Sequence, residues 1–189
     1  VWQLLSFLIG SELLLPSPWA VVRSFCGLAQ TTEFYRSILH TLLRVAAGFA
    51  AGMAAGLLAG TLTAFSRAAD VLLTPLKNII KATPVTSFIV LILLYFSSNV
   101  TPSAVAFLAV LPICWSNVCE GLRQTDKKMT ELAHAYAFGR KKTLREIYFP
   151  AVRPYLSAAA TTGLGFAWKS CVAAEVIALS KNSVGRALY

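Results

Sequence analysis

The chain has 189 residues, of which 57% are hydrophobic and 13% are charged, and its mean hydropathy is +0.66. Soluble domains contain about 25% charged residues, so this composition excludes an ordinary soluble domain. It predicts one all-α domain over residues 1–189, a polytopic transmembrane helical bundle. The net charge of +9 does not indicate a nucleic-acid-binding protein, because the basic residues cluster in loops between apolar segments, where they orient a chain in a membrane.

Residues 1–65 contain one partial and one complete predicted span. Residues 1–10 are apolar but fall short of the about 20 residues that a helix needs to cross a bilayer, so we interpret them as the end of a span that begins before this sequence. Residues 38–65 form the clearest span. Arg44 in this span either reaches the membrane interface or lines a transport pathway. Four glycines of the span recur at every fourth residue, on one helix face where another helix can approach closely: Gly48, Gly52, Gly56 and Gly60.

Three further spans are predicted after residue 70. Residues 71–97 form a span broken at Pro84, which is either a simple proline kink or a broken helix beside a transport pathway. Residues 102–122 form the next span, and residues 152–179 form the last. Each is long enough to cross a bilayer as a helix.

The last span carries the most informative ionisable residues. Charged groups within a membrane are costly and usually functional, so Lys169 and Glu175 are pathway candidates, together with Trp168 next to Lys169. Lys169 either contacts a polar or anionic solute in a pathway or pairs with a carboxylate on a neighbouring helix, such as Glu120. Six residues of helix separate Lys169 from Glu175 by about 120°, so the two are not a ready pair.

A polar loop over residues 129–150 separates the last two spans. Residues 129–138 are rich in helix formers and predict a short helix, with Thr130 as its cap and Gly139 at its end. A second short helix is predicted to start at a capping box and to end at a proline; these residues are Thr143, Glu146 and Pro150.

The basic residues give the orientation. Eleven lie on the side of this loop and four on the other, so the loop is predicted to be cytoplasmic. The eleven are Arg67, Lys77, Lys81, Arg123, Lys127, Lys128, Arg140, Lys141, Lys142, Arg145 and Arg153. The four are Arg23, Arg36, Lys181 and Arg186.

The loop resembles the EAA loop of ABC importer permeases, whose pattern is E-A-A, a glycine six residues after the Glu, and I-x-L-P. The matching residues, at unbroken spacing, are Glu131, Leu132, Ala133, Ala137 and Ile147-Tyr148-Phe149-Pro150. Leu132 and Phe149 depart from the pattern, and Ala137 stands where the pattern has glycine, with Gly139 two residues later. Residues 15–21, 41–48 and 167–177 resemble the nitrate, sulfonate and taurine branch of the type I importers.

The resemblance implies a type I permease fold in a bacterial inner or plasma membrane, with a further span after this sequence, so that both ends would be truncated. It also implies an ATP-binding cassette subunit, an extracytoplasmic binding protein and a second permease copy, as a homodimer, as partners. The solute would be small and polar or anionic, such as a sulfonate or nitrate, or a vitamin precursor. The implied ATPase-coupling residues are Glu131, Ala133, His134, Tyr136, Ala137, Phe138, Gly139 and Arg140.

No catalytic constellation is evident. The GxxxxGK[ST] pattern is absent, so we expect ATP and Mg to be bound by the partner subunit and this chain to be a non-catalytic subunit without a cofactor of its own. His40 and His134 show no ligand spacing, and the four cysteines have no C-x-x-C spacing, so no metal site is predicted. Two other classes stay open: an ion-coupled secondary transporter that uses Lys169 and Glu175, and a structural membrane subunit.

Overall fold

The computed structural model describes residues 1–10 and 15–187; the side chains of Leu4, Ile9, Lys127 and His134 are outside its description. Within these ranges every regular element is helical, which confirms the predicted all-α class. The helices are α1 (Trp2–Ile9), α2 (Pro18–Leu28), α3 (Thr32–Phe65), α4 (Arg67–Ala82), α5 (Val85–Tyr95), α6 (Thr101–Arg123), α7 (Lys127–Ala135), α8 (Arg140–Thr143), a π-helical turn (Leu144–Tyr148), α9 (Phe149–Ala178) and α10 (Val184–Ala187).

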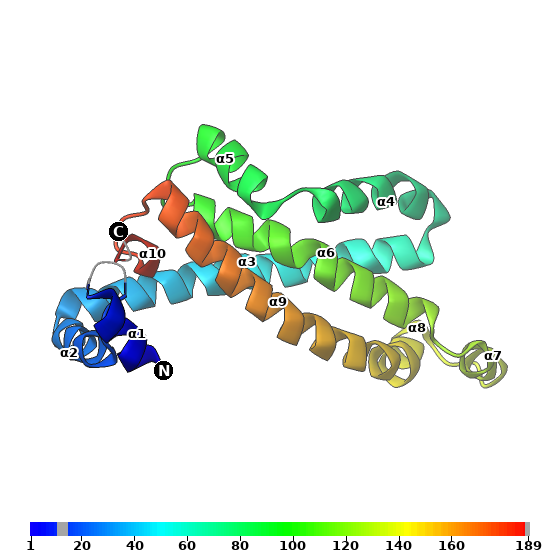
Figure 1. Ribbon diagram of the computed structural model, residues 1–189. Coiled ribbons are helices and arrows are strands. Elements are labelled where there is room, and N and C mark those ends of the chain that lie inside the picture. Colours follow the sequence, from blue (N-terminus) through cyan, green and yellow to red (C-terminus); the bar gives the residue numbers. More distant parts are fainter. Residues whose placement is uncertain (11–14, 188–189) are drawn as a thin grey trace.

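Three long helices, α3, α6 and α9, form the body of the molecule, with α6 packed against both others (Figure 1). Figure 1 shows α7 and α8 at one end of this bundle and α2 and α10 at the other. Buried Val110 of α6 packs with Val45 of α3 and with Ala167 and Cys171 of α9. The buried core therefore runs along α6, where α3 and α9 pack against it.

The glycine face of α3 lies directly on α6. All four glycines are buried, and a Cβ added at any of them would come within 2.5–2.8 Å of an α6 atom. At Gly52 that atom is Val110 Cβ, at 2.7 Å, and at Gly56 it is Cys114 Cβ, at 2.6 Å. Such distances leave no room for a methyl group, so the close approach of the two backbones requires glycine at these positions.

The predicted break at Pro84 is present. Helices α4 and α5 meet at an angle of 103° across Thr83 and Pro84. Proline lacks the N–H that would continue α4, and the Thr83 hydroxyl donates to the Ile79 carbonyl oxygen at 2.8 Å, which satisfies one of the carbonyls at the end of α4. The break is therefore a sharp corner rather than a shallow proline kink.

Two lysines of α4 lie beside α6. Ser66 caps α4 directly after α3, so the chain turns back along the bundle. Lys77 Nζ lies 5.7 Å from the ring centroid of Trp115, well inside α6. Lys81 lies near Pro112, midway along α6. Their assignment to the cytoplasmic side of the membrane stays a prediction, and the other nine basic residues on that side favour the same orientation without them.

The spans differ in how apolar they are. Among the described helices, α3 and α6 are long and apolar enough to cross a membrane, and α4 with α5 makes a third if the bent pair counts as one span. The helix α9 has 30 residues but is not among the helices that are both long and apolar enough to cross a membrane. The five-span arrangement stays a prediction.

The polar loop folds differently from the sequence prediction. Helix α7 begins at Lys127, where Asp126 Oδ1 accepts a hydrogen bond from the Lys128 N–H at 2.9 Å; Thr130 therefore does not mark the start of the helix. The capping box is not formed, because α8 begins after Gly139, and the Thr143 hydroxyl donates to the Gly139 carbonyl oxygen at 3.3 Å.

Pro150 does not end a helix as predicted. It lies in the first turn of α9, directly after the π-helical turn, where the Phe149 N–H bonds to the Leu144 carbonyl oxygen. The wider π-helical turn lets the helix continue through a residue that has no N–H to donate. The polar loop is thereby joined to α9 without a break in the helical backbone.

Candidate functional site

The turn between α7 and α8 has a defined backbone geometry. Ala137 adopts the left-handed conformation with φ of 51°, and the Phe138 N–H donates to the Ala133 carbonyl oxygen at 2.8 Å. This is the hydrogen bond of a Schellman ending, in which the left-handed position usually carries glycine. Ala137, which stands where the EAA pattern has glycine, therefore occupies this left-handed position, and Gly139 precedes α8 as its N-cap residue.

The predicted coupling residues separate into exposed and inward-facing groups. Tyr136 is 74% exposed, whereas Ala133 is 3% exposed. Phe138 is half-buried, with Lys142 Nζ 3.9 Å from its ring centroid, so it packs within the loop. The His134 side chain lies outside the described part. The remaining predicted coupling residues, all exposed, are Glu131, Ala137, Gly139 and Arg140.

An apolar stripe on α7 was missed by the sequence analysis. Met129 and Leu132, which are 53% and 50% exposed, precede Tyr136 by seven and four residues and therefore share its helix face. The i, i+3, i+7 pattern of these three residues could have revealed the stripe. We call Met129, Leu132 and Tyr136 the α7 apolar stripe.

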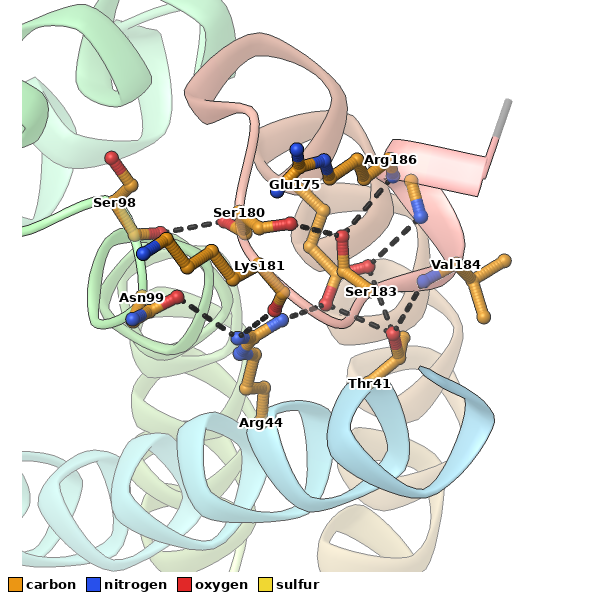
Figure 2. A network of polar contacts seen from close by, with 11 residues as sticks. Thr41, Arg44, Ser98, Asn99, Glu175, Ser180, Lys181, Ser183, Val184 and Arg186 are labelled. Atoms are coloured by element: carbon orange, nitrogen blue, oxygen red, sulfur yellow. Dashed lines mark hydrogen bonds and ion pairs between the residues drawn. The ribbon is translucent and has the colours of Figure 1, made fainter. Parts of the chain in front are cut away.

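A polar network lies at the opposite end of the bundle, around Glu175 (Figure 2). The Glu175 side chain is fully buried and accepts hydrogen bonds from Thr41 Oγ1 at 2.9 Å, from Arg44 Nη1 at 2.9 Å and from the Gly185 N–H at 3.2 Å. Thr41 Oγ1 also accepts from the Val184 N–H at 3.1 Å. A buried carboxylate needs such partners, because its desolvation is otherwise costly.

Arg44 extends the network to two further segments. Its Nη2 donates to Asn99 Oδ1 at 3.3 Å and to the Lys181 carbonyl oxygen at 3.0 Å. The Ser180 hydroxyl donates to the Ser98 carbonyl oxygen at 2.6 Å. The network therefore ties α3, α9, the α5–α6 connection and residues 180–185 together (Figure 2), and the Arg44 side chain forms an ion pair instead of reaching freely to the interface.

The chain reaches this network through two tight turns. Leu179 and Asn182 both have positive φ, of 48° and 49°, which bends residues 180–187 back over the end of α9. At Gly185 a Cβ would lie 2.5 Å from Glu175 Cβ, so only glycine fits there. Sequence reasoning placed Arg44 and Glu175 as separate candidates, and no spacing rule could pair residues this far apart.

Lys169 and Trp168 are exposed on α9. Within the described residues Lys169 makes no ion pair, and Glu120, its suggested partner, accepts a hydrogen bond from Gln124 Nε2 at 2.6 Å. The structural pairing is therefore not observed, and the pathway role stays a prediction. The ion-coupled alternative depends on Glu175, whose carboxylate is instead tied to Arg44. Among the described residues there is also no metal-binding group of three or more His, Cys, Asp or Glu residues.

Comparison with known proteins identifies the family. Residues 52–188 match the family described as "Binding-protein-dependent transport system inner membrane component". The chain is 32% identical over 189 residues to the putative aliphatic sulfonates transport permease protein SsuC of Escherichia coli (strain K12), covering 97% of this chain and 70% of that protein. It is 28% identical over 188 residues to SsuC of Bacillus subtilis (strain 168), covering 98% and 67%.

A third relative has a different solute in its name. The nitrate import permease protein NrtB of Synechococcus elongatus is 26% identical over 189 residues, covering 94% of this chain and 67% of that protein. The family match covers most of the chain, and the relatives include permeases named for sulfonates and for nitrate. Together these findings confirm the resemblance to the sulfonate and nitrate branch of ABC importer permeases. The chain therefore belongs to the family of inner-membrane components of binding-protein-dependent transport systems, the permeases of ABC importers.

Proposed function

We propose that this chain forms the solute pathway of an ABC importer and couples it to ATP hydrolysis on a partner subunit. The observation that carries the proposal is the α7 apolar stripe, which is exposed at the end of the bundle that the basic residues predict to be cytoplasmic. An exposed apolar cluster centred on an aromatic side chain is typical of a protein interface. The ATP-binding cassette subunit is the partner that fits this side of the membrane.

The helical backbone offers a route for the coupling. From Arg140 through the π-helical turn to Ala178 the chain is helical without interruption, a length of about 58 Å at 1.5 Å per residue. Its first turn adjoins the α7–α8 turn, and its last turn carries Glu175 in the polar network. Movement of the docked α7 would therefore displace an element that reaches the far end of the bundle.

The solute class is inferred from the relatives and from charge. Relatives are named for aliphatic sulfonates, nitrate and riboflavin, and two of these three solute classes are anions. Lys169 is exposed and makes no ion pair within the described residues, which favours an anionic solute. We propose that an extracytoplasmic binding protein delivers the solute and that a second copy of the permease completes the pathway.

The test is a Tyr136→Ala variant, with Tyr95→Ala as its control. Tyr95 is 80% exposed but lies at the end of α5, away from α7. Loss of an aromatic interface anchor costs about 2 kcal/mol or more, so the affinity of the ATPase subunit should fall more than about tenfold. Co-purification and ATP-driven uptake are the measurements. An intact complex with normal uptake in Tyr136→Ala would refute the docking assignment.

A further inference from the structure

A cavity of about 250 Å³ lies at the corner between α4 and α5, where both helices meet α6 and α9. Figure 1 shows α5 and the end of α4 beside the middle and upper part of α6. The large apolar side chains in its wall are Phe88 of α5, Leu108 of α6 and Phe166 of α9. The break at Pro84 creates the cavity, because a straight helix would leave no corner there.

The wall of this cavity includes one basic residue. Lys81 lines the cavity, and no carboxylate of the described residues does. Of the described carboxylates nearest in sequence, Asp70 is bonded to Arg123 and Thr74, and Glu120 is bonded to Gln124. Lys81 therefore has no ion-pair partner within the described residues.

A second basic residue, Lys169, lies on the face of α9 that lines the cavity. Thr162 and Phe166 line the cavity, and Lys169 follows Phe166 by three residues and Thr162 by seven, which places it on the same helix face. The Thr162 hydroxyl makes no hydrogen bond within the described chain, so it is available to a ligand. Lys169 is exposed and takes no part in the polar network around Glu175. It therefore places a second positive charge on the face of α9 that lines the cavity.

We propose that this cavity binds an organic anion with a short apolar chain. The anionic group lies at Lys81, and the chain packs against Phe88, Leu108 and Phe166. Pockets for drug-sized ligands measure about 300–1,000 Å³, so a cavity of 250 Å³ suits a shorter chain and is too small for the two acyl chains of a phospholipid. A bare inorganic anion would leave the apolar wall unfilled. The proposal rests on the proposed function, since it places part of the solute's route at this corner.

The experiment measures equilibrium binding to the assembled transporter in phosphatidylcholine nanodiscs. The probe is 1-butanesulfonate; inorganic sulfate supplies the anionic group alone, and 1-butanol supplies the chain alone. We expect 1-butanesulfonate to bind at least about tenfold more tightly than either, because it makes both kinds of contact. Lys81→Met should weaken its binding about tenfold by removing a charge-assisted contact, while Lys81→Arg should retain it.

A volume change provides an independent check. Ala109→Leu fills the cavity from α6 and should abolish binding of 1-butanesulfonate. The matched control, Ala54→Leu, adds the same atoms at an exposed position of α3 outside the cavity and should bind like the parent. Elution volume and basal ATPase activity of each variant report whether the transporter is still assembled.

Several results would overturn the proposal. Binding of 1-butanesulfonate no tighter than that of sulfate would do so, as would binding unchanged in both Lys81→Met and Ala109→Leu. A phosphatidylglycerol molecule retained by the parent, lost from Lys81→Met and not displaced by 1-butanesulfonate would make this a lipid site. If ATP-driven uptake persists in such cases, the proposed function stands without this site. If 1-butanesulfonate binds as expected but uptake never depends on ATP, the proposed function fails and the site remains.

Discussion

Replacing a glycine of α3 by alanine should destabilise the bundle, although alanine is the better helix former. At Gly52 the new Cβ would lie 2.7 Å from Val110 Cβ, and at Gly56 it would lie 2.6 Å from Cys114 Cβ. Ordinary contact begins at about 3.4 Å, and the neighbouring atoms belong to a helix that is itself packed, so the helices must move apart. Overpacking of this kind costs about 1–3 kcal/mol, against a gain of about 1 kcal/mol in helix propensity.

The expected outcome for Gly52→Ala or Gly56→Ala is a net loss of up to about 2 kcal/mol. Gly165→Ala is the matched control, because a Cβ there would meet no atom within 4 Å, and it should be neutral or stabilising by up to about 1 kcal/mol. Thermal unfolding of the purified protein in detergent, followed by loss of the monodisperse peak, measures the difference. A Gly52→Ala protein as stable as Gly165→Ala would refute the close packing of α3 on α6.

Three further predictions follow from single contacts. Arg44→Met leaves the buried Glu175 charge without its ion-pair partner and should lower stability by about 3–5 kcal/mol; adding Glu175→Gln should recover part of the loss in thermal unfolding, and no recovery would contradict a direct coupling. Ala137→Gly relieves a left-handed conformation at φ of 51° and should stabilise the α7–α8 turn by about 1 kcal/mol, seen as slower hydrogen exchange; faster exchange would contradict it. Asp70→Asn removes an ion pair with Arg123 whose side chains are 32% and 48% exposed, so stability should change by no more than about 1 kcal/mol; a larger loss in the same unfolding assay would show that the pair is not solvent-screened.

Local sequence patterns predicted the helices and several of their details. The four-residue recurrence from Gly48 to Gly60 placed the glycines on one face of a helix, and Pro84 located the break between α4 and α5, because both effects depend on backbone geometry alone. The spacing of the residues in the polar loop that resemble the EAA pattern indicated the family, and the comparisons with known proteins confirmed the family. Helix boundaries were less certain: the chain passes through Pro150 because the π-helical turn changes the hydrogen-bond pattern before it, an effect that propensities do not contain.

The tertiary structure alone decided which residues meet. Arg44 and Glu175 were both recognised as unusual in an apolar span, but they are separated by 131 residues, and only the packing of α3 beside α9 brings them together. The same holds for Lys77 beside Trp115 and Lys81 near Pro112, because the turn at Ser66 brings α4 back along α6. Sequence determines periodicity and local conformation over a few residues, whereas ion pairs and cavities depend on the relative positions of distant helices, which packing fixes.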